Sequence, residues 1–203
     1  MTTGSLAMPR RLAPRPVPAA PPVSNTRLAM IVVVAAESML FVGLIGAYLV
    51  FRLAARVWPP PDLPRLPLAV TGLNTLVLLA SAFPMTRALQ AVRRDEPRGA
   101  APAVAWTAGL GIVFLLVQGA EWTRLVKHGL TLGGSLYGAT FYLLIGCHGV
   151  HVLGAVLWLA TTGVLAHRAA FTAARHAGLE MCAIYWYFVC GLWLVLFPLV
   201  YLY

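Results

Sequence analysis

The chain has 203 residues, of which 60% are hydrophobic and only 10% are charged. Because a soluble domain carries about 25% charged residues, this composition predicts an integral membrane protein with a single domain. The net charge of +9 would suit a nucleic-acid-binding protein. However, the Arg and Lys residues lie in short loops between apolar runs, which is the pattern of topology signals and of contacts with anionic lipids. We therefore expect no nucleic-acid partner.

Residues 1–27 are rich in Pro, Ala and Arg, and we expect them to form a disordered cytoplasmic arm. Five apolar runs follow, each close to the roughly 20 residues that a membrane-spanning helix needs. The runs cover residues 28–51, 66–85, 103–121, 136–165 and 181–203. They predict an all-α polytopic membrane protein, because helices satisfy their backbone polar groups internally.

The basic residues are distributed unequally between the two ends of these spans. The side that holds the N-terminal arm has ten Lys or Arg residues, and the opposite side has five. Cytoplasmic loops carry the excess of such residues. We therefore expect a cytoplasmic N-terminus and a periplasmic C-terminus in a bacterial inner membrane.

The connection after the first run is proline-rich, with the sequence WPPP at 58–61. Proline removes backbone donors and restricts its neighbour, so this loop should cross the membrane surface as an extended segment. Trp58 is expected to be an interfacial anchor. In the last run, Trp186, Cys190 and Trp193 share one helical face, and Pro198 should end the regular bonding.

Glu37 is a carboxylate inside the first apolar run. On a helix it lies about 13 Å from Leu28, near the middle of a hydrocarbon core about 30 Å thick. An ionised group at that depth costs at least about 3 kcal/mol and faces the bundle interior or a cavity. Two interpretations stay open, namely a proton or lipid-headgroup role and a structural hydrogen bond to a facing helix.

His148 and His151 are three residues apart in the fourth run, and we expect both to face the same neighbouring helix. Metal or haem ligation and interhelical hydrogen bonding are the two possibilities. Two histidines at membrane depth are too few for a haem-copper or di-iron centre, so we expect no metal site. Gln118 and Glu121, near the outer end of the third run, are expected to form an interfacial hydrogen-bonding pair.

The common enzyme motifs are missing from the sequence. It contains no Ser-centred nucleophile elbow, no phosphate-binding glycine loop and no His-Glu-x-x-His zinc helix. An embedded carboxylate would suit a proton-coupled transporter, although no inverted repeat relates the two halves.

Five stretches follow one another in order from about residue 30 to the end. They are AESMLF (36–41) with Gly43 and AY (47–48); WPPP (58–61) with LPL (66–68) and LNTLVLL (73–79); QGAEW (118–122); FY (141–142) with HGVHV (148–152); and HAGLE (176–180) with YWYFV (185–189) and WL (193–194). Together they resemble subunit III of haem-copper terminal oxidases, in a five-span form that lacks the first two of seven helices. Tyr187 and Cys190 stand where the family usually has His and Asp.

The resemblance implies a subunit of a cytochrome c oxidase that is not catalytic by itself and binds no haem or copper. It would pack beside subunit I, which holds those metals, and would be associated with subunit II through the complex. It would also bind phospholipids in a cleft and support the proton uptake and the stability of subunit I. The lipid-cleft or proton-related positions would be Glu37, His148, His151, His176 and Glu180. The helix-contact or interfacial positions would be Trp58, Gln118, Glu121, Trp186 and Tyr187. The alternatives are an accessory protein of a nitric oxide reductase and a proton-coupled transporter.

Overall fold

The computed structural model describes residues 24–61 and 63–202. The arm expected at residues 1–27 therefore lies almost wholly outside the described residues. Within them the long elements are all helices, and five helical segments are long and apolar enough to cross a membrane. The predicted all-α architecture with five spanning helices is confirmed.

The helices extend beyond most of the apolar runs. Their bounds are α1 Asn25–Ala54, α2 Leu68–Ala80, α3 Ala82–Arg93, α4 Pro97–Lys127, α5 Leu136–His167 and α6 Ala177–Phe197, followed by the π-helix η1 Pro198–Leu202. The added turns carry Arg, Lys and His residues, for example at both ends of α4. Polar residues continue a helix into the headgroup region without a change in periodicity, so apolar run lengths underestimate helix lengths.

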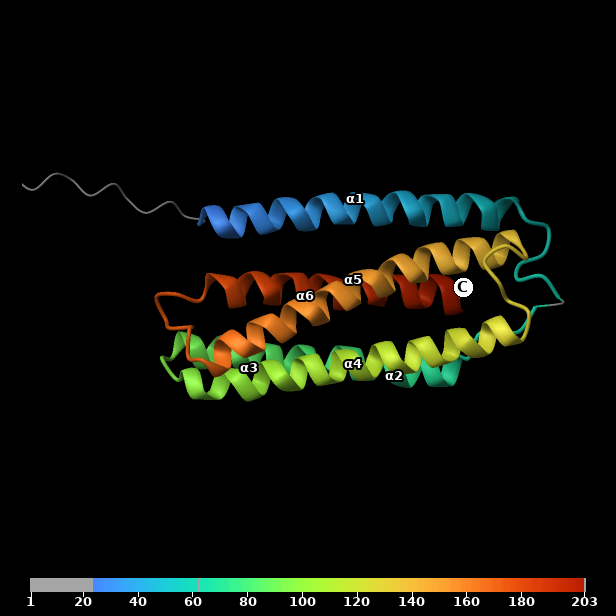
Figure 1. Cartoon of the computed structure of the whole chain (residues 1–203). Helices are drawn as coiled ribbons and strands as arrows, with labels where there is room; N and C mark the ends of the chain where they lie inside the picture. Colours follow the sequence, from blue (N-terminus) through green and yellow to red (C-terminus); the bar gives the residue numbers. More distant parts are fainter. Residues whose placement is uncertain (1–23, 62, 203) are drawn as a thin grey trace, which may run out of the picture.

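Figure 1 shows α1 along one side of the bundle, next to α5 and α6, with α2, α3 and α4 on the far side. α4 packs most extensively on α5 and on α3. α1 buries only Met30, Phe41 and Tyr48, and its Met39 is 76% exposed. Most of the apolar surface of α1 therefore faces away from the rest of the chain.

The helix of the second spanning segment is interrupted where α2 meets α3, at Ser81. Pro84 has no backbone N–H to bond to the carbonyl of Ala80, which interrupts the helical ladder. The Ser81 hydroxyl donates to the Leu78 carbonyl and accepts a 3.0 Å hydrogen bond from Trp186 Nε1. A side chain of α6 thus bonds to the chain at this interruption.

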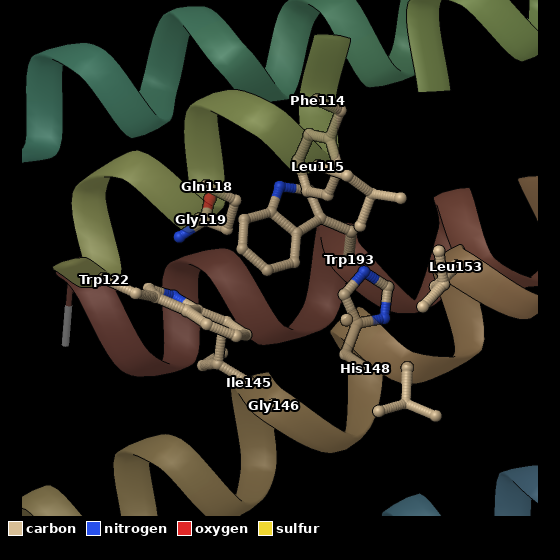
Figure 2. A pocket seen from close by; sticks show the side chains of 12 residues that line it. Phe114, Leu115, Gln118, Gly119, Trp122, Ile145, Gly146, His148, Leu153 and Trp193 are labelled. Atoms are coloured by element: carbon tan, nitrogen blue, oxygen red, sulfur yellow. The ribbon is translucent and has the colours of Figure 1, made fainter. Parts of the chain in front are cut away.

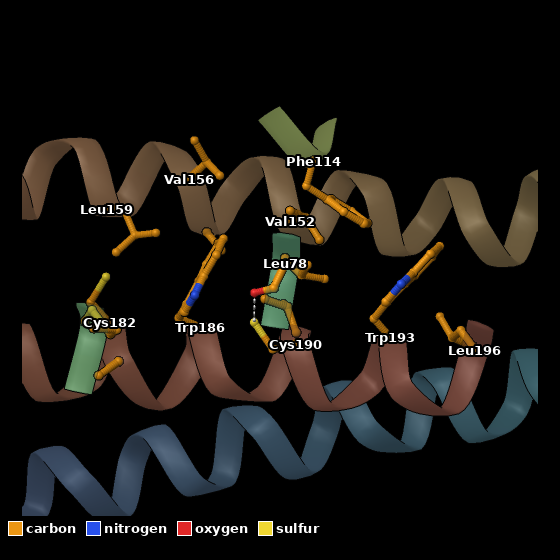
Figure 3. Packing of buried hydrophobic residues seen from close by; sticks show 14 of the residues in the cluster. Leu78, Phe114, Val152, Val156, Leu159, Cys182, Trp186, Cys190, Trp193 and Leu196 are labelled. Atoms are coloured by element: carbon orange, nitrogen blue, oxygen red, sulfur yellow. Dashed lines mark hydrogen bonds between the residues drawn. The ribbon is translucent and has the colours of Figure 1, made fainter. Parts of the chain in front are cut away.

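The buried face of α6 forms much of the core against α5, as Figure 3 shows. Trp186, Cys190 and Trp193 line this face as predicted, and Trp193 Nε1 donates to Thr75 Oγ1 of α2 at 2.8 Å. The regular helix stops at Phe197, and Pro198 begins the π-helical turn, which confirms the predicted end of regular bonding.

A glycine of α4 packs directly against this core. A Cβ atom at Gly111 would lie 2.6 Å from the ring of Trp186 and 2.8 Å from Val156 Cγ2. At Gly109, two residues earlier on the same helix, a Cβ atom would meet nothing within 4 Å. Only the first position needs glycine for packing.

We expect Gly111→Ala to lower the stability of the bundle by about 1–3 kcal/mol, because the added methyl overpacks a dense core. The matched control Gly109→Ala adds the same methyl into open space and should change stability by less than about 0.5 kcal/mol. Thermal unfolding in detergent, followed by circular dichroism, measures both. Equal midpoints for the two variants would contradict the tight packing.

Candidate functional site

Glu37 of α1 contacts His151 of α5 across the helix interface. Glu37 Oε2 lies 2.9 Å from His151 Nε2, and the two side chains are 30% and 14% exposed, respectively. His151 Nδ1 lies 2.7 Å from the carbonyl oxygen of Cys147, which can only accept a hydrogen bond. Nδ1 therefore carries a hydrogen, and the contact between Nε2 and Oε2 requires one further proton.

That further proton has two possible positions on the pair. It can sit on the carboxyl, which then donates to a neutral imidazole, or on Nε2, so that an imidazolium donates to a carboxylate. Both arrangements have a net charge of zero. In either arrangement one proton lies at the contact between Glu37 and His151, and the two side chains carry no net charge.

Phe41, one turn after Glu37, covers the inner side of the pair. Its side chain is 1% exposed, and its ring packs edge-on against His151 at a centroid distance of 5.0 Å. Cys147 Sγ lies 3.8 Å from His151 Nδ1. The pair is therefore closed toward the core and open toward the outer surface between α1 and α5.

His148 does not join this pair, which differs from the expectation that both histidines face the same neighbour. It stacks on Trp193 of α6 at a centroid distance of 5.0 Å and an interplanar angle of 22°. Phe41, at 6.5 Å, touches its edge. Positions three apart on a helix differ by about 60° in direction, which is enough to point two side chains at different helices of a bundle.

Glu180 and His176 lie at the start of α6, near the end of the bundle where α1 begins. Glu180 Oε1 is 3.6 Å from Arg93 Nη2 and 3.9 Å from Arg27 Nε, and both Arg side chains are largely exposed. His176 is the residue that precedes α6. Since α1 rises about 15 Å between Arg27 and Glu37, this cluster is separate from the pair of Glu37 and His151.

Gln118 and Glu121 do not bond to each other, in contrast to the expected pair. Gln118 Nε2 donates to Tyr201 Oη at 3.1 Å, whereas Glu121 Oε1 accepts from Arg124 Nη1 at 2.9 Å. The reason is that Tyr201, in the terminal π-helical turn, brings a buried hydroxyl to Gln118, while Arg124 lies one turn beyond Glu121.

The other expected contact residues do join helices. Trp58 packs edge-on between Tyr48 of α1 and Tyr137 of α5, at centroid distances of 5.8 and 5.0 Å. Tyr187 Oη lies 2.9 Å from Thr86 Oγ1 of α3. Trp58 therefore closes one end of the interface between α1 and α5 and is more than a surface anchor.

The sequence reasoning missed a polar face on α2. Asn74 Nδ2 donates to the carbonyl of Phe114 at 3.0 Å, and Thr75 accepts from Trp193. The spacing of Thr71, Asn74 and Thr75 in the sequence could have revealed this polar face, because it places three polar residues on one side of an apolar helix. Such residues typically form interhelical hydrogen bonds in membranes.

Metal binding finds no support in the described part of the chain. There, no group of three or more His, Cys, Asp or Glu residues is placed to hold a metal ion.

Comparison with known proteins gives one consistent result. The sequence model described as cytochrome c oxidase subunit III matches residues 21–203. The cytochrome c oxidase subunit 3 of Synechocystis sp. is 38% identical over 168 residues, which cover 82% of this chain and 71% of that protein. The cytochrome c oxidase subunit 3 of Thermostichus vulcanus is 35% identical over 176 residues, which cover 86% of each chain. That of Marchantia polymorpha is 34% identical over 181 residues, which cover 86% of this chain and 67% of that protein. This chain belongs to the cytochrome c oxidase subunit III family.

Proposed function

We propose that this chain is a non-redox subunit of a cytochrome c oxidase that supports proton uptake and stability of the catalytic subunit I. Membership of the subunit III family implies a complex with other oxidase subunits. The relatives are named as cytochrome c oxidase subunits, which favours this function over a nitric oxide reductase accessory protein or an independent transporter. In the complex, subunit I would carry the haem and copper.

The contact between Glu37 and His151 is the observation that carries the proton-related role. The pair holds one proton in the apolar part of the bundle, and moving that proton between the two groups creates no net charge. Such a movement avoids the cost of an isolated charge in hydrocarbon. The partly exposed side of the pair lies where a lipid or a neighbouring subunit would cover α1 and α5.

The depth of the pair fits a role on the proton-uptake side. Glu37 lies about 18 Å along the helix from the start of α1. The surplus of Lys and Arg at that end of the bundle favours a cytoplasmic location for it. We propose that protons taken up from the cytoplasm equilibrate with this pair.

A second feature supports lipid binding. A groove of about 1060 Å³ runs between the first half of α4 and the last half of α5. Its walls include small residues such as Ala105, Ala108 and Gly163, and Arg98, His167 and Arg168 lie at one end. We propose that an anionic phospholipid lies there, with its acyl chain along the small residues and its phosphate near the two arginines. Glu37 and the histidines of α5 expected in a lipid cleft do not line this groove, so their lipid contacts would be elsewhere.

We expect Glu37→Gln in the intact oxidase to shorten its working lifetime several-fold. The amide cannot exchange a proton with His151, so proton uptake slows during repeated turnover while the initial oxygen consumption stays close to that of the wild type. Oxygen consumption and proton uptake in liposomes measure both. Glu96→Gln, which neutralises an exposed carboxylate between α3 and α4, is the matched control.

The outcome also tests the wider proposal. An unchanged lifetime and unchanged proton uptake in Glu37→Gln would leave the carboxyl with a structural role only. Purification of the chain without a haem-bearing partner would contradict its place in an oxidase.

We expect the double variant Arg98→Gln and Arg168→Gln to weaken binding of an anionic phospholipid to the complex. Each cation near a headgroup contributes about 1 kcal/mol, so the loss of both corresponds to roughly thirtyfold in affinity. Native mass spectrometry with phosphatidylglycerol measures the bound lipid. The control is the double variant Arg65→Gln and Lys127→Gln, which removes the same charge at the opposite end of the bundle and should retain the bound lipid. Equal loss of lipid in both double variants would argue against the groove.

A further inference from the structure

Two hollows adjoin at the end of the bundle where α1 and α4 finish. The larger, of about 520 Å³, is bounded by the end of α1, the loop before α2, the start of α5 and the terminal π-helical turn. The smaller, of about 230 Å³, lies between that loop and the end of α4. Figure 1 shows the loops after α1 and after α4 at this same end. Arg65 lines both hollows, and we call the surface made by their lining residues the Arg65 face.

The Arg65 face is basic. Arg52 and Arg65 line the larger hollow, and Arg65 and Arg124 line the smaller one. Glu121 is the one acidic residue among the described residues that line either hollow. Figure 2 shows a contrasting cavity between α4, α5 and α6, whose described lining residues include no Arg, Lys, Asp or Glu. The Arg65 face thus differs from this cavity in its charge.

Membrane topology does not account for this charge. The sequence places five basic residues at this end of the bundle and two acidic ones, Asp62 and Glu121, which leaves a net charge of +3. The larger number of basic residues at the opposite end predicts that this end lies outside the cytoplasm, where basic residues are normally fewer. A role in binding gives a reason for arginines on that side.

Pro residues make the Arg65 face rigid. The segment of residues 59–61 consists of three prolines that line the larger hollow, and Pro64 and Pro67 line the smaller one. Proline fixes φ, so this backbone has little conformational freedom to lose when a partner binds. The surface is therefore formed before a partner arrives.

The arginines are oriented by the chain and still face outward. Arg52 Nη1 donates to Tyr48 Oη at 3.1 Å. Arg124 Nη1 donates to Glu121 Oε1 at 2.9 Å, yet the Arg124 side chain is 70% exposed. A guanidinium has five N–H donors, so the bond to Glu121 leaves most of those of Arg124 for another acceptor. Arg65 is exposed between these two residues in the lining.

We propose that the Arg65 face docks an acidic loop of a neighbouring oxidase subunit on the outer side of the membrane. This inference rests on the proposed function, since it takes the chain as part of an oxidase complex. Carboxylates of the loop would pair with the guanidinium groups, whose planar geometry matches a carboxylate. Trp58, Leu63 and Leu66 add apolar wall to the larger hollow, which suits an apolar side chain beside the acidic ones.

Two observations favour a protein over an anionic lipid at this face. The face is built from loops and helix ends, and its prolines and aromatic residues offer no long channel of small residues for an acyl chain. Anionic lipids give the cytoplasmic leaflet its negative surface potential, whereas this end is expected to lie on the other side. Membership of the subunit III family implies other oxidase subunits that could supply the acidic loop.

A zero-length cross-link in the intact oxidase tests the contact. Lys127 is the only lysine of the chain, so the double variant Lys127→Arg and Arg65→Lys moves that amine onto the face at constant charge. A water-soluble carbodiimide should join the amine to an Asp or Glu of another subunit, which peptide mass spectrometry identifies. The matched control, Lys127→Arg with Arg56→Lys, places the amine on an exposed residue outside both hollows and should give much less product.

Charge reversal tests whether the contact holds the subunit. Arg65→Glu exchanges an attraction across the interface for a repulsion, so NaCl should release the chain from an affinity-tagged partner subunit at an at least about twofold lower concentration. Arg94→Glu makes the same charge change on an exposed residue at the opposite end and should leave the release unchanged. Reversal of the cross-linked acidic residue to Lys should restore the binding of Arg65→Glu.

Three results would overturn the proposal. They are cross-links confined to acidic residues of this chain, such as Asp62, unchanged release of Arg65→Glu by salt, and loss of bound phosphatidylglycerol from Arg65→Glu while the subunits stay associated. The last result would assign the face to the membrane surface. If any of them occurs while the chain still purifies with a haem-bearing partner, the proposed function stands and only this docking surface is wrong.

Discussion

The bundle depends on one constraint, which is that a polar side chain inside hydrocarbon is destabilising unless it finds a partner within the protein. Glu37 meets this constraint through His151, Trp193 through Thr75, and Trp186 through Ser81. Each bond joins two different helices. In a bilayer, where apolar surfaces gain nothing by leaving lipid for protein, such bonds and close packing select the arrangement of the helices.

This constraint also separates what the sequence could predict from what it could not. The number of spans follows from apolar run lengths, and Glu37 stands out because a lone carboxylate in such a run is rare. Its partner was one of several candidates, since a three-residue spacing on α5 does not decide which histidine faces α1. The hydrogen bonds of Thr75 and Ser81 could not be predicted from the sequence, because small hydroxyl residues are common in spans and become informative only when the facing tryptophans are known.

The same constraint divides the polar residues into two groups with different consequences. Paired groups such as Glu37 and His151 are satisfied by the chain itself, so their chemistry concerns the proton they hold. Other buried groups, such as His148 and Trp122, carry polar atoms with no hydrogen-bond partner among the described residues, so packing contacts such as the stacking of His148 on Trp193 hold them in place. The three-residue spacing of His148 and His151 in the sequence conceals this difference until the helices are placed.

The contact of α1 with the rest of the bundle has a consequence for biogenesis. His151 follows Glu37 by 114 residues, so the first helix enters the bilayer long before its hydrogen-bond partner has been synthesised. During that interval the carboxyl of Glu37 cannot bond to His151, and in the folded bundle α1 buries only a small part of its own surface. The contacts that join α1 to the bundle are made with α5 and α6, so they form only after these later helices have been synthesised, which makes translation order part of how this subunit assembles.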